Sequence, residues 1–167
     1  MSGQKDAETR LAEKFWEEIE DSPFIMLGLQ GVDDDFTRPM TAQIDDGKIY
    51  FFAARSEDLF KGLGRSSRAI ATYAGKGHKL FASIHGSLIE DTDRAVIERL
   101  WNPIIASWYK DGKDDPDLVL LRFDAESADL WEAQAGATLK AAALKMLFNI
   151  DPGKEHQDEH RAEVALS

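Results

Sequence analysis

A segment near the end of the chain has the residue types and spacing of a metal site. His156, Glu159 and His160 reproduce the H-x-x-E-H pattern of the inverted zinc peptidases. The segment is densely charged, and only seven residues follow His160. Because so little chain remains to supply a third ligand and a surrounding pocket, we interpret the segment as a solvated turn and expect no metal site.

Other motifs with possible chemistry are incomplete. The acidic run at 33–35 lacks the glycine and the terminal glutamate of a calcium-binding loop. Gly62 and Gly64 follow an expected helix and lack the third glycine of a dinucleotide-binding loop, so we expect them to end that helix. The sequence has no G-x-S-x-G nucleophile elbow and no cysteine. Thiolate catalysis, disulfides and cysteine-type zinc sites are therefore excluded.

The basic residues gather in one part of an otherwise acidic chain. The net charge of the whole chain is -11, which disfavours nucleic acids because they are polyanions. Residues 55–79, in contrast, hold six lysines and arginines and only two acids, Glu57 and Asp58. They include Lys76-Gly77-His78-Lys79, an expected turn whose glycine exposes backbone N–H groups to an anion. A small anionic ligand would explain this cluster, and so would a solvated surface.

Hydrophobic periodicity predicts a mainly β chain with inserted helices, an α+β or barrel arrangement rather than alternating β-α-β units. Asp46-Gly47 between two strand-like runs is a strong hairpin signal. Gly86 inside a long strand-like run is typical of a bulge. We expect about six strands in all. The strand-like runs lie at 24–30, 39–44, 48–54, 68–74, 79–90, 118–123 and 128–133.

Helices are expected before and between these strands. Ser56 is expected to cap a short helix that has Glu57 and Asp58 in its first turn. A longer helical stretch is broken at Asn102-Pro103. Trp101 and Trp108 lie on that stretch, where packing in the core is the ordinary role of a tryptophan. The expected helices lie at 6–20, from 56 onward, at 91–109 and at 137–148.

Length and composition indicate one domain. The chain has 167 residues, of which 43% are hydrophobic. It has no run of eighteen apolar residues, so we expect no membrane-spanning helix. Its first residues lack the apolar region of a signal peptide, which favours a cytoplasmic location. We expect a domain at 1–150 and a charged C-terminal tail at 151–167.

The order of the motifs resembles a known family. Arg38-Pro39-Met40 opens a strand, the Asp46-Gly47 hairpin follows, and Trp131 lies on a late strand. Between them come Ile49-Tyr50-Phe51-Phe52-Ala53-Ala54, Ala71-Thr72-Tyr73-Ala74, Phe81-Ala82-Ser83-Ile84-His85-Gly86, Leu100-Trp101, Trp108-Tyr109 and Gly112-Lys113-Asp114-Asp115-Pro116. Over about residues 8–150 the set resembles the general stress protein 26 group of the pyridoxamine 5'-phosphate oxidase-related, FMN-binding split barrels.

The resemblance implies a six-stranded antiparallel split β-barrel that works as a homodimer, with FMN in clefts across the dimer interface. FAD or a deazaflavin in place of FMN are alternatives. Arg38 would lie near the flavin phosphate or the ring edge, and Ser56 with its helix would meet the phosphate. The other implied cofactor contacts are Pro39, Met40 and Thr41 along the ring, Phe52, Ala53 and Ala54 beside it, Asp58 and Leu59 on the short helix, and Lys76, Lys79 and Trp131, reaching it from the partner chain.

Two departures from the family pattern bear on activity. Asp58 stands where the family usually has a lysine, so either another cation must meet the phosphate or Asp58 accepts a ribityl hydroxyl. After Trp131 there is no Arg-x-His element, so oxidation of pyridoxamine phosphate is not expected. The expected function is a flavin-dependent oxidoreductase of unknown substrate, whose chemistry belongs to the flavin. The alternatives are a non-catalytic protein that buffers or senses flavin, and a dimeric interaction module without flavin.

Overall fold

The structure is a computed structural model that describes residues 2–31, 37–64, 67–133 and 161–166. The acidic run at 33–35, the helix expected at 137–148 and the H-x-x-E-H segment lie outside the described residues.

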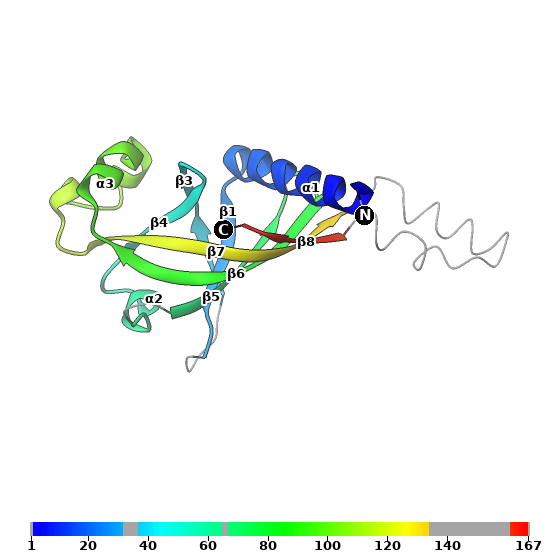
Figure 1. Ribbon diagram of the computed structural model, residues 1–167. Coiled ribbons are helices and arrows are strands. Elements are labelled where there is room, and N and C mark those ends of the chain that lie inside the picture. Colours follow the sequence, from blue (N-terminus) through cyan, green and yellow to red (C-terminus); the bar gives the residue numbers. More distant parts are fainter. Residues whose placement is uncertain (1, 32–36, 65–66, 134–160, 167) are drawn as a thin grey trace.

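A curled antiparallel sheet of eight strands forms the body of the molecule (Figure 1). Seven strands follow one another in the order β2-β1-β5-β6-β7-β4-β3, and β8 also pairs with β7. The strands are β1 (Phe24–Leu29), β2 (Arg38–Thr41), β3 (Gln43–Asp45), β4 (Lys48–Ala54), β5 (Ser67–Ala74), β6 (Leu80–Asp91), β7 (Leu118–Glu132) and β8 (Arg161–Ala165). The predicted class, mainly β with inserted helices in an antiparallel split barrel, is confirmed.

The strand count exceeds the expected six for local reasons. The run expected at 39–44 divides at Ala42. The Ala42 backbone N–H donates to the Pro23 carbonyl oxygen at 2.7 Å, which is the next pair in the β1–β2 register, and from Gln43 onward the chain pairs with β4 instead. The runs at 118–123 and 128–133 join into the single strand β7. Strand β8 was not predicted, because it lies within the charged segment after residue 150.

The break at Ala42 closes the barrel. Strand β2 pairs with β1 at one end of the strand order, and β3 pairs with β4 at the other end. These two strands are consecutive in the chain, with only Ala42 between them. The chain therefore links the two edges of the sheet and brings β2 beside β4.

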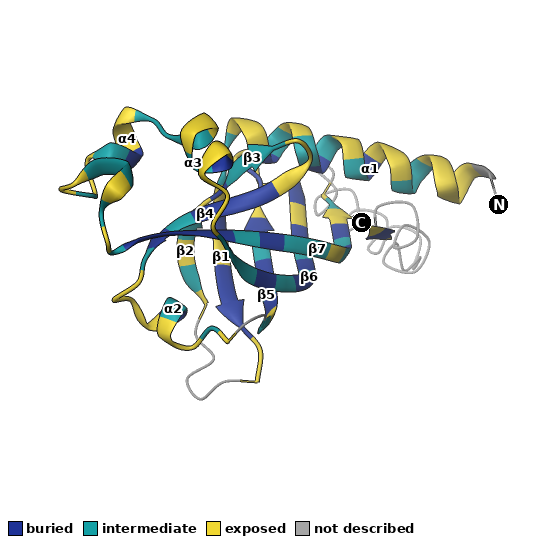
Figure 2. Ribbon diagram, turned by 60° about the vertical axis from the view of Figure 1, so that its left-hand side comes forward, coloured by how far each residue is buried: buried dark blue, intermediate teal, exposed yellow. Residues whose placement is uncertain are grey.

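Helix α1 (Ser2–Asp21) lies along one side of the barrel (Figure 2). Leu11, Phe15 and Ile19 of this helix are completely buried, at the three- and four-residue spacing of an apolar helix face. They pack in one core cluster with inward side chains of the strands, such as Leu27 and Ile84. The amphipathic helix expected at 6–20 is confirmed and is longer than predicted.

The other helices of the described residues are short and lie at the end of the barrel away from β8 (Figures 1 and 2). They are α2 (Asp58–Lys61), α3 (Arg94–Leu100), α4 (Pro103–Ala106) and the 3-10 helix η1 (Gly112–Asp114). The expected break at Asn102-Pro103 is confirmed. The Asn102 side-chain oxygen caps α4 by accepting from the backbone N–H groups of Ile104 and Ile105 at 3.0 and 3.1 Å.

Two glycine positions fix the course of the sheet. Asp46 and Gly47 have φ of 49° and 70°, so the β3–β4 hairpin turns through two left-handed residues, as its sequence predicts. At Gly86 the pairing of β6 with β7 shifts register, which is the expected bulge. A side chain there would clash with the β7 backbone, since a Cβ would lie 2.9 Å from the Asp124 carbonyl carbon.

Replacing Gly86 by alanine should destabilise the fold. The new methyl group meets backbone atoms of Asp124 and Ala125, which cannot yield as a flexible side chain would. We expect a loss of about 2 kcal/mol or more in the free energy of unfolding, the scale of overpacking in a core. Urea denaturation followed by circular dichroism measures it. Gly77→Ala is the control, because the nearest atom to its Cβ is 4.0 Å away, and an equal loss there would contradict the account.

Candidate functional site

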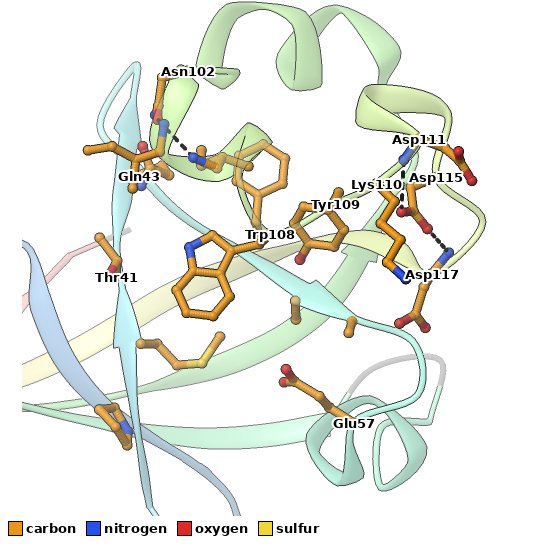
Figure 3. Close-up of a pocket in the computed structure, with 17 residues that line it drawn as sticks. Thr41, Gln43, Glu57, Asn102, Trp108, Tyr109, Lys110, Asp111, Asp115 and Asp117 are labelled. Atoms are coloured by element: carbon orange, nitrogen blue, oxygen red, sulfur yellow. Dashed lines mark hydrogen bonds between the residues drawn. The ribbon is translucent and has the colours of Figure 1, made fainter.

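A pocket of about 620 Å³ opens between the barrel and the short helices. Its floor comes from β2 and β4, and its opposite side comes from α4 and the loop that carries η1 (Figure 3). The volume is typical of pockets that hold an organic ligand or cofactor. The pocket lies where the barrel closure brings β2 beside β4.

The floor consists of residues that the sequence predicts as cofactor contacts. They are Pro39, Met40 and Thr41 of β2, and Phe52, Ala53 and Ala54 of β4. These six residues lie on two strands that are not paired neighbours in the sheet, and they line one cavity. The small side chain of Ala54 leaves room above the β4 backbone, whereas the Ala53 side chain is buried in the core cluster.

Arg38 precedes this floor and has an unsatisfied atom. Its side chain is partly buried, and among the described residues its Nε atom is buried and has no hydrogen-bond partner. A buried donor without a partner costs about 1–3 kcal/mol. Arg38 is not part of the pocket lining, which begins at its neighbour Pro39. A buried atom without a partner calls for an explanation, and a bound ligand is one.

The opposite side of the pocket is apolar and was missed by the sequence analysis. Ile104 and Trp108 line the pocket, and they are 76% and 80% exposed. The expectation that Trp108 packs in the core is wrong, because the helix stops at Ala106 and Trp108 follows it in a loop. Trp101 is partly buried and packs edge-to-face on Phe52, with ring centroids 5.9 Å apart. The Asn102-Pro103 signal predicts the helix break but not where the next tryptophan points.

The rim of the pocket is acidic, which the sequence analysis also missed. Glu57, Asp111, Asp115 and Asp117 line it, with Lys110 as the one basic residue of the lining. Burial, together with the charges of Glu57, Asp117 and Asp115, raises the pKa of Tyr109 to about 12. Tyr109 is therefore a neutral phenol at neutral pH. The basic residues at 55–79 indicated a positively charged site for an anionic ligand, which is the opposite of this acidic rim.

Asp117 also engages Ser56. Its two carboxylate oxygens accept from the Ser56 backbone N–H and hydroxyl, both at 2.8 Å. The prediction that Ser56 caps the short helix is wrong: α2 begins at Asp58, and Glu57 is its N-cap residue. The carboxylate of Asp117 outcompetes the helix for the hydroxyl because a charged acceptor makes the stronger hydrogen bond.

The other residues predicted on α2 lie outside the pocket lining. The Asp58 side chain is 89% exposed, and its carboxylate is 3.7 Å from the Lys61 ammonium. Leu59 is buried in the core cluster. No group of acids and histidines suited to a metal ion occurs within the part of the chain that the structure describes.

The model of one protein family matches residues 10–154, most of the chain, and its description is "Pyridoxamine 5'-phosphate oxidase like". The chain belongs to this family.

Solved structures of relatives agree with the family assignment. A general stress family protein of Xanthomonas campestris pv. campestris has 50% identity, with 76% of this chain and 90% of that one covered and a TM-score of 0.72. The general stress FMN/FAD binding protein of Xanthomonas citri has 49% identity, with 76% and 92% covered and a TM-score of 0.72. A general stress protein 26 of Jannaschia sp. CCS1 has 30% identity, with 94% and 99% covered and a TM-score of 0.75. A search of curated proteins found no match.

In this pyridoxamine 5'-phosphate oxidase-like chain, three predicted contacts lie at the opposite end of the barrel from the pocket. Lys76 and Lys79 are exposed in the turn before β6. Trp131 near the end of β7 pairs with Arg161 of β8, and β8 lies at the end away from α3 and α4 (Figure 1). Within one chain these residues do not reach the pocket. None of the helices in the described part of the chain is both apolar and long enough to span a membrane.

Proposed function

We propose that this protein binds FMN in the pocket between β2 and β4 and acts in the cytoplasm as a flavin-dependent oxidoreductase. The observation that carries the proposal is the convergence of Pro39, Met40, Thr41 and Ala54 on one cavity beside Arg38. The family resemblance assigns the same residues to the flavin. A relative with 49% identity is described as an FMN/FAD binding protein.

The residues present fit a flavin. The β2 and β4 backbones offer two extended walls for a flat ring, and the Nε donor of Arg38 offers an uncompensated hydrogen bond. We assign the phosphate to the Arg38 side, because the Ser56 side carries Asp117, Glu57 and Asp58. Ser56 and Asp58 therefore become weaker candidates for phosphate contacts than the resemblance implies.

The choice of FMN over FAD rests on the family resemblance. Both cofactors carry their phosphate at the same end of the flavin, beyond the ribityl chain, so the acidic rim on the other side of the pocket does not separate them.

When bound, FMN supplies hydride and electron transfer at its N5 atom, and the protein supplies binding and orientation. The phenol of Tyr109 stays protonated near neutral pH, so it donates a hydrogen bond into the pocket and does not serve as a base. The apolar Trp108, Ile104 and Phe52 side chains would exclude water from part of the cavity once a ligand covers them.

We also propose a homodimer that shares this site. Ala74 of β5 pairs with Phe81 of β6, and Phe81 pairs with Trp131 of β7, so the three form one row on the outer face of the sheet. Phe24 and Met26 are exposed on the same face of β1. Such a row of exposed large apolar side chains is typical of an interface. A second copy covering it would bring its own Trp131, Lys76 and Lys79 to the pocket of the first.

Arg38→Ala should weaken FMN binding and leave the protein folded. The variant removes a charge-assisted donor worth roughly 1.5–3 kcal/mol, which corresponds to a loss of about ten- to a hundredfold in affinity. Quenching of flavin fluorescence in a titration measures the dissociation constant. Arg99→Ala is the matched control, since Arg99 pairs with Asp45 outside the pocket lining.

Wild-type protein that leaves FMN fluorescence unchanged would refute flavin binding. Unchanged affinity in folded Arg38→Ala protein would refute the assignment of the site. The oxidoreductase role has its own readout. FMN on the protein, once photoreduced with EDTA as the electron donor, should pass its electrons to an added acceptor faster than free FMN does under the same conditions. Equal rates would favour a flavin-buffering protein.

Light scattering should give twice the chain mass of 18.7 kDa. Phe81→Glu places a charge in the middle of the exposed apolar row, so it should yield a monomer with much weaker FMN affinity. Ala95→Glu is the control, because it adds the same charge at an exposed position of α3 outside this row. A wild-type monomer that binds FMN with full affinity would rule out a shared site.

A further inference from the structure

The side of the pocket away from β2 joins aromatic surface to negative charge. Trp108 and Tyr109 project into it from the loop after α4, and Glu57 lies across from them on the segment before α2 (Figure 3). Asp115 and Asp117 belong to a third segment, between η1 and β7. The charge thus comes from separate parts of the chain that meet at one cavity.

The rim carboxylates contribute negative charge to the same part of the pocket, the space around Tyr109. Glu57, Asp115 and Asp117 each act on the phenol of Tyr109, so their fields overlap inside the pocket. Backbone N–H donors hold two of them: the Asp117 N–H donates to Asp115, and the Ser56 N–H donates to Asp117. Neutral donors hold these side chains in place without cancelling their charge.

The cations nearest in sequence do not offset this charge. Arg55 forms an ion pair with Glu90, at 2.7 Å, and Lys113 forms one with Glu98. Lys61 lies beside the exposed Asp58. Within one chain, Lys110 is the one basic residue of the lining, against four carboxylates. Lys76 and Lys79 of a second copy are proposed above as contacts of the flavin, so they are assigned to the flavin side of the shared site and not to this half.

Trp108 gives this half of the pocket its affinity for a particular kind of molecule. An indole that is 80% exposed costs free energy to solvate unless a ligand covers it. The face of an indole attracts organic cations. A flat or aromatic ligand with a positive charge would cover the indole face of Trp108 and would be attracted by the carboxylates of the rim.

We propose that this half of the pocket takes a cationic organic substrate, one with an aromatic or other apolar body and an amine or quaternary nitrogen. The inference rests on the proposed function in one respect: the flavin occupies the β2–β4 side, and the substrate lies beside it. The cavity itself is the site, and the carboxylates set the sign of charge that it accepts. Anionic donors, including those with a pyrophosphate, are disfavoured by the same field.

A pair of probes that differ in charge tests the proposal. Benzyltrimethylammonium and benzenesulfonate each carry one benzene ring, with opposite charges. Calorimetric titration into full-length protein at low ionic strength, both without flavin and after loading with FMN, gives the two affinities. We expect the cation to bind at least about tenfold more tightly than the anion in both forms, and the ratio to fall as salt is added.

Variants of Glu57 sharpen the test. Glu57→Gln removes one rim charge and should reduce the preference for the cation by about threefold, and Glu57→Lys should reduce it further. Asp46→Asn is the matched control, because it removes a carboxylate at the β3–β4 turn, outside the lining, and asparagine also suits that turn. It should leave the preference unchanged.

Equal affinities of the two probes, tighter binding of the sulfonate, or no binding of either would overturn the proposal. So would an equal effect of Asp46→Asn and Glu57→Gln, since the preference would then reflect the net charge of the whole chain. Because the flavin-free protein gives its own result, these outcomes stay separate from a failure to bind FMN.

Discussion

The hydrogen bond from the Ala42 backbone N–H to the Pro23 carbonyl oxygen marks the point on which the site depends. It is the last bond between this segment and the β1 side of the sheet, because the next residue, Gln43, already pairs with β4. The chain thus passes from one edge of the sheet to the other without a loop. Closing the barrel there brings β2 beside β4, and these two strands form the pocket floor. The bulge at Gly86 gives the long β6–β7 pair the curvature that such closure requires. The site is therefore a consequence of how the barrel closes.

Much of this arrangement could be predicted from local sequence. The Asp46-Gly47 turn and the helix break at Asn102-Pro103 are set by backbone conformations or hydrogen bonds within a few residues, so short motifs reveal them. Gly86 marks the bulge in the sequence, although the contact that requires a glycine there is with the distant β7 backbone. The division at Ala42 could not be predicted, because it comes from a change of partner strand, from β1 before Ala42 to β4 after it, that exists only in the closed barrel. Strand β8 could not be predicted either. A charged segment of this kind forms a strand only where it can pair with a strand already in the sheet, here β7.

The site shows the same limit. The resemblance grouped residues that line one cavity, because they lie on two strands whose order the motifs preserve; their contact with a cofactor stays a prediction. The acidic rim was missed because its members come from separate loops, and summing charge along residues 55–79 placed a positive field there. In the fold, Arg55 is paired with Glu90, and Lys76 and Lys79 lie at the other end of the barrel. Charge along a sequence segment is a poor guide to the field in a pocket that several segments build.

The central claim is that the flavin ring lies between β2 and β4, and a crystal structure of the protein grown with FMN tests it most directly. The account predicts density for the ring against Pro39, Met40 and Ala54, with the Arg38 Nε donating to the cofactor and Trp131 of a second copy at its edge. A ring bound elsewhere on the barrel, or a pocket that stays empty at saturating FMN, would contradict the account.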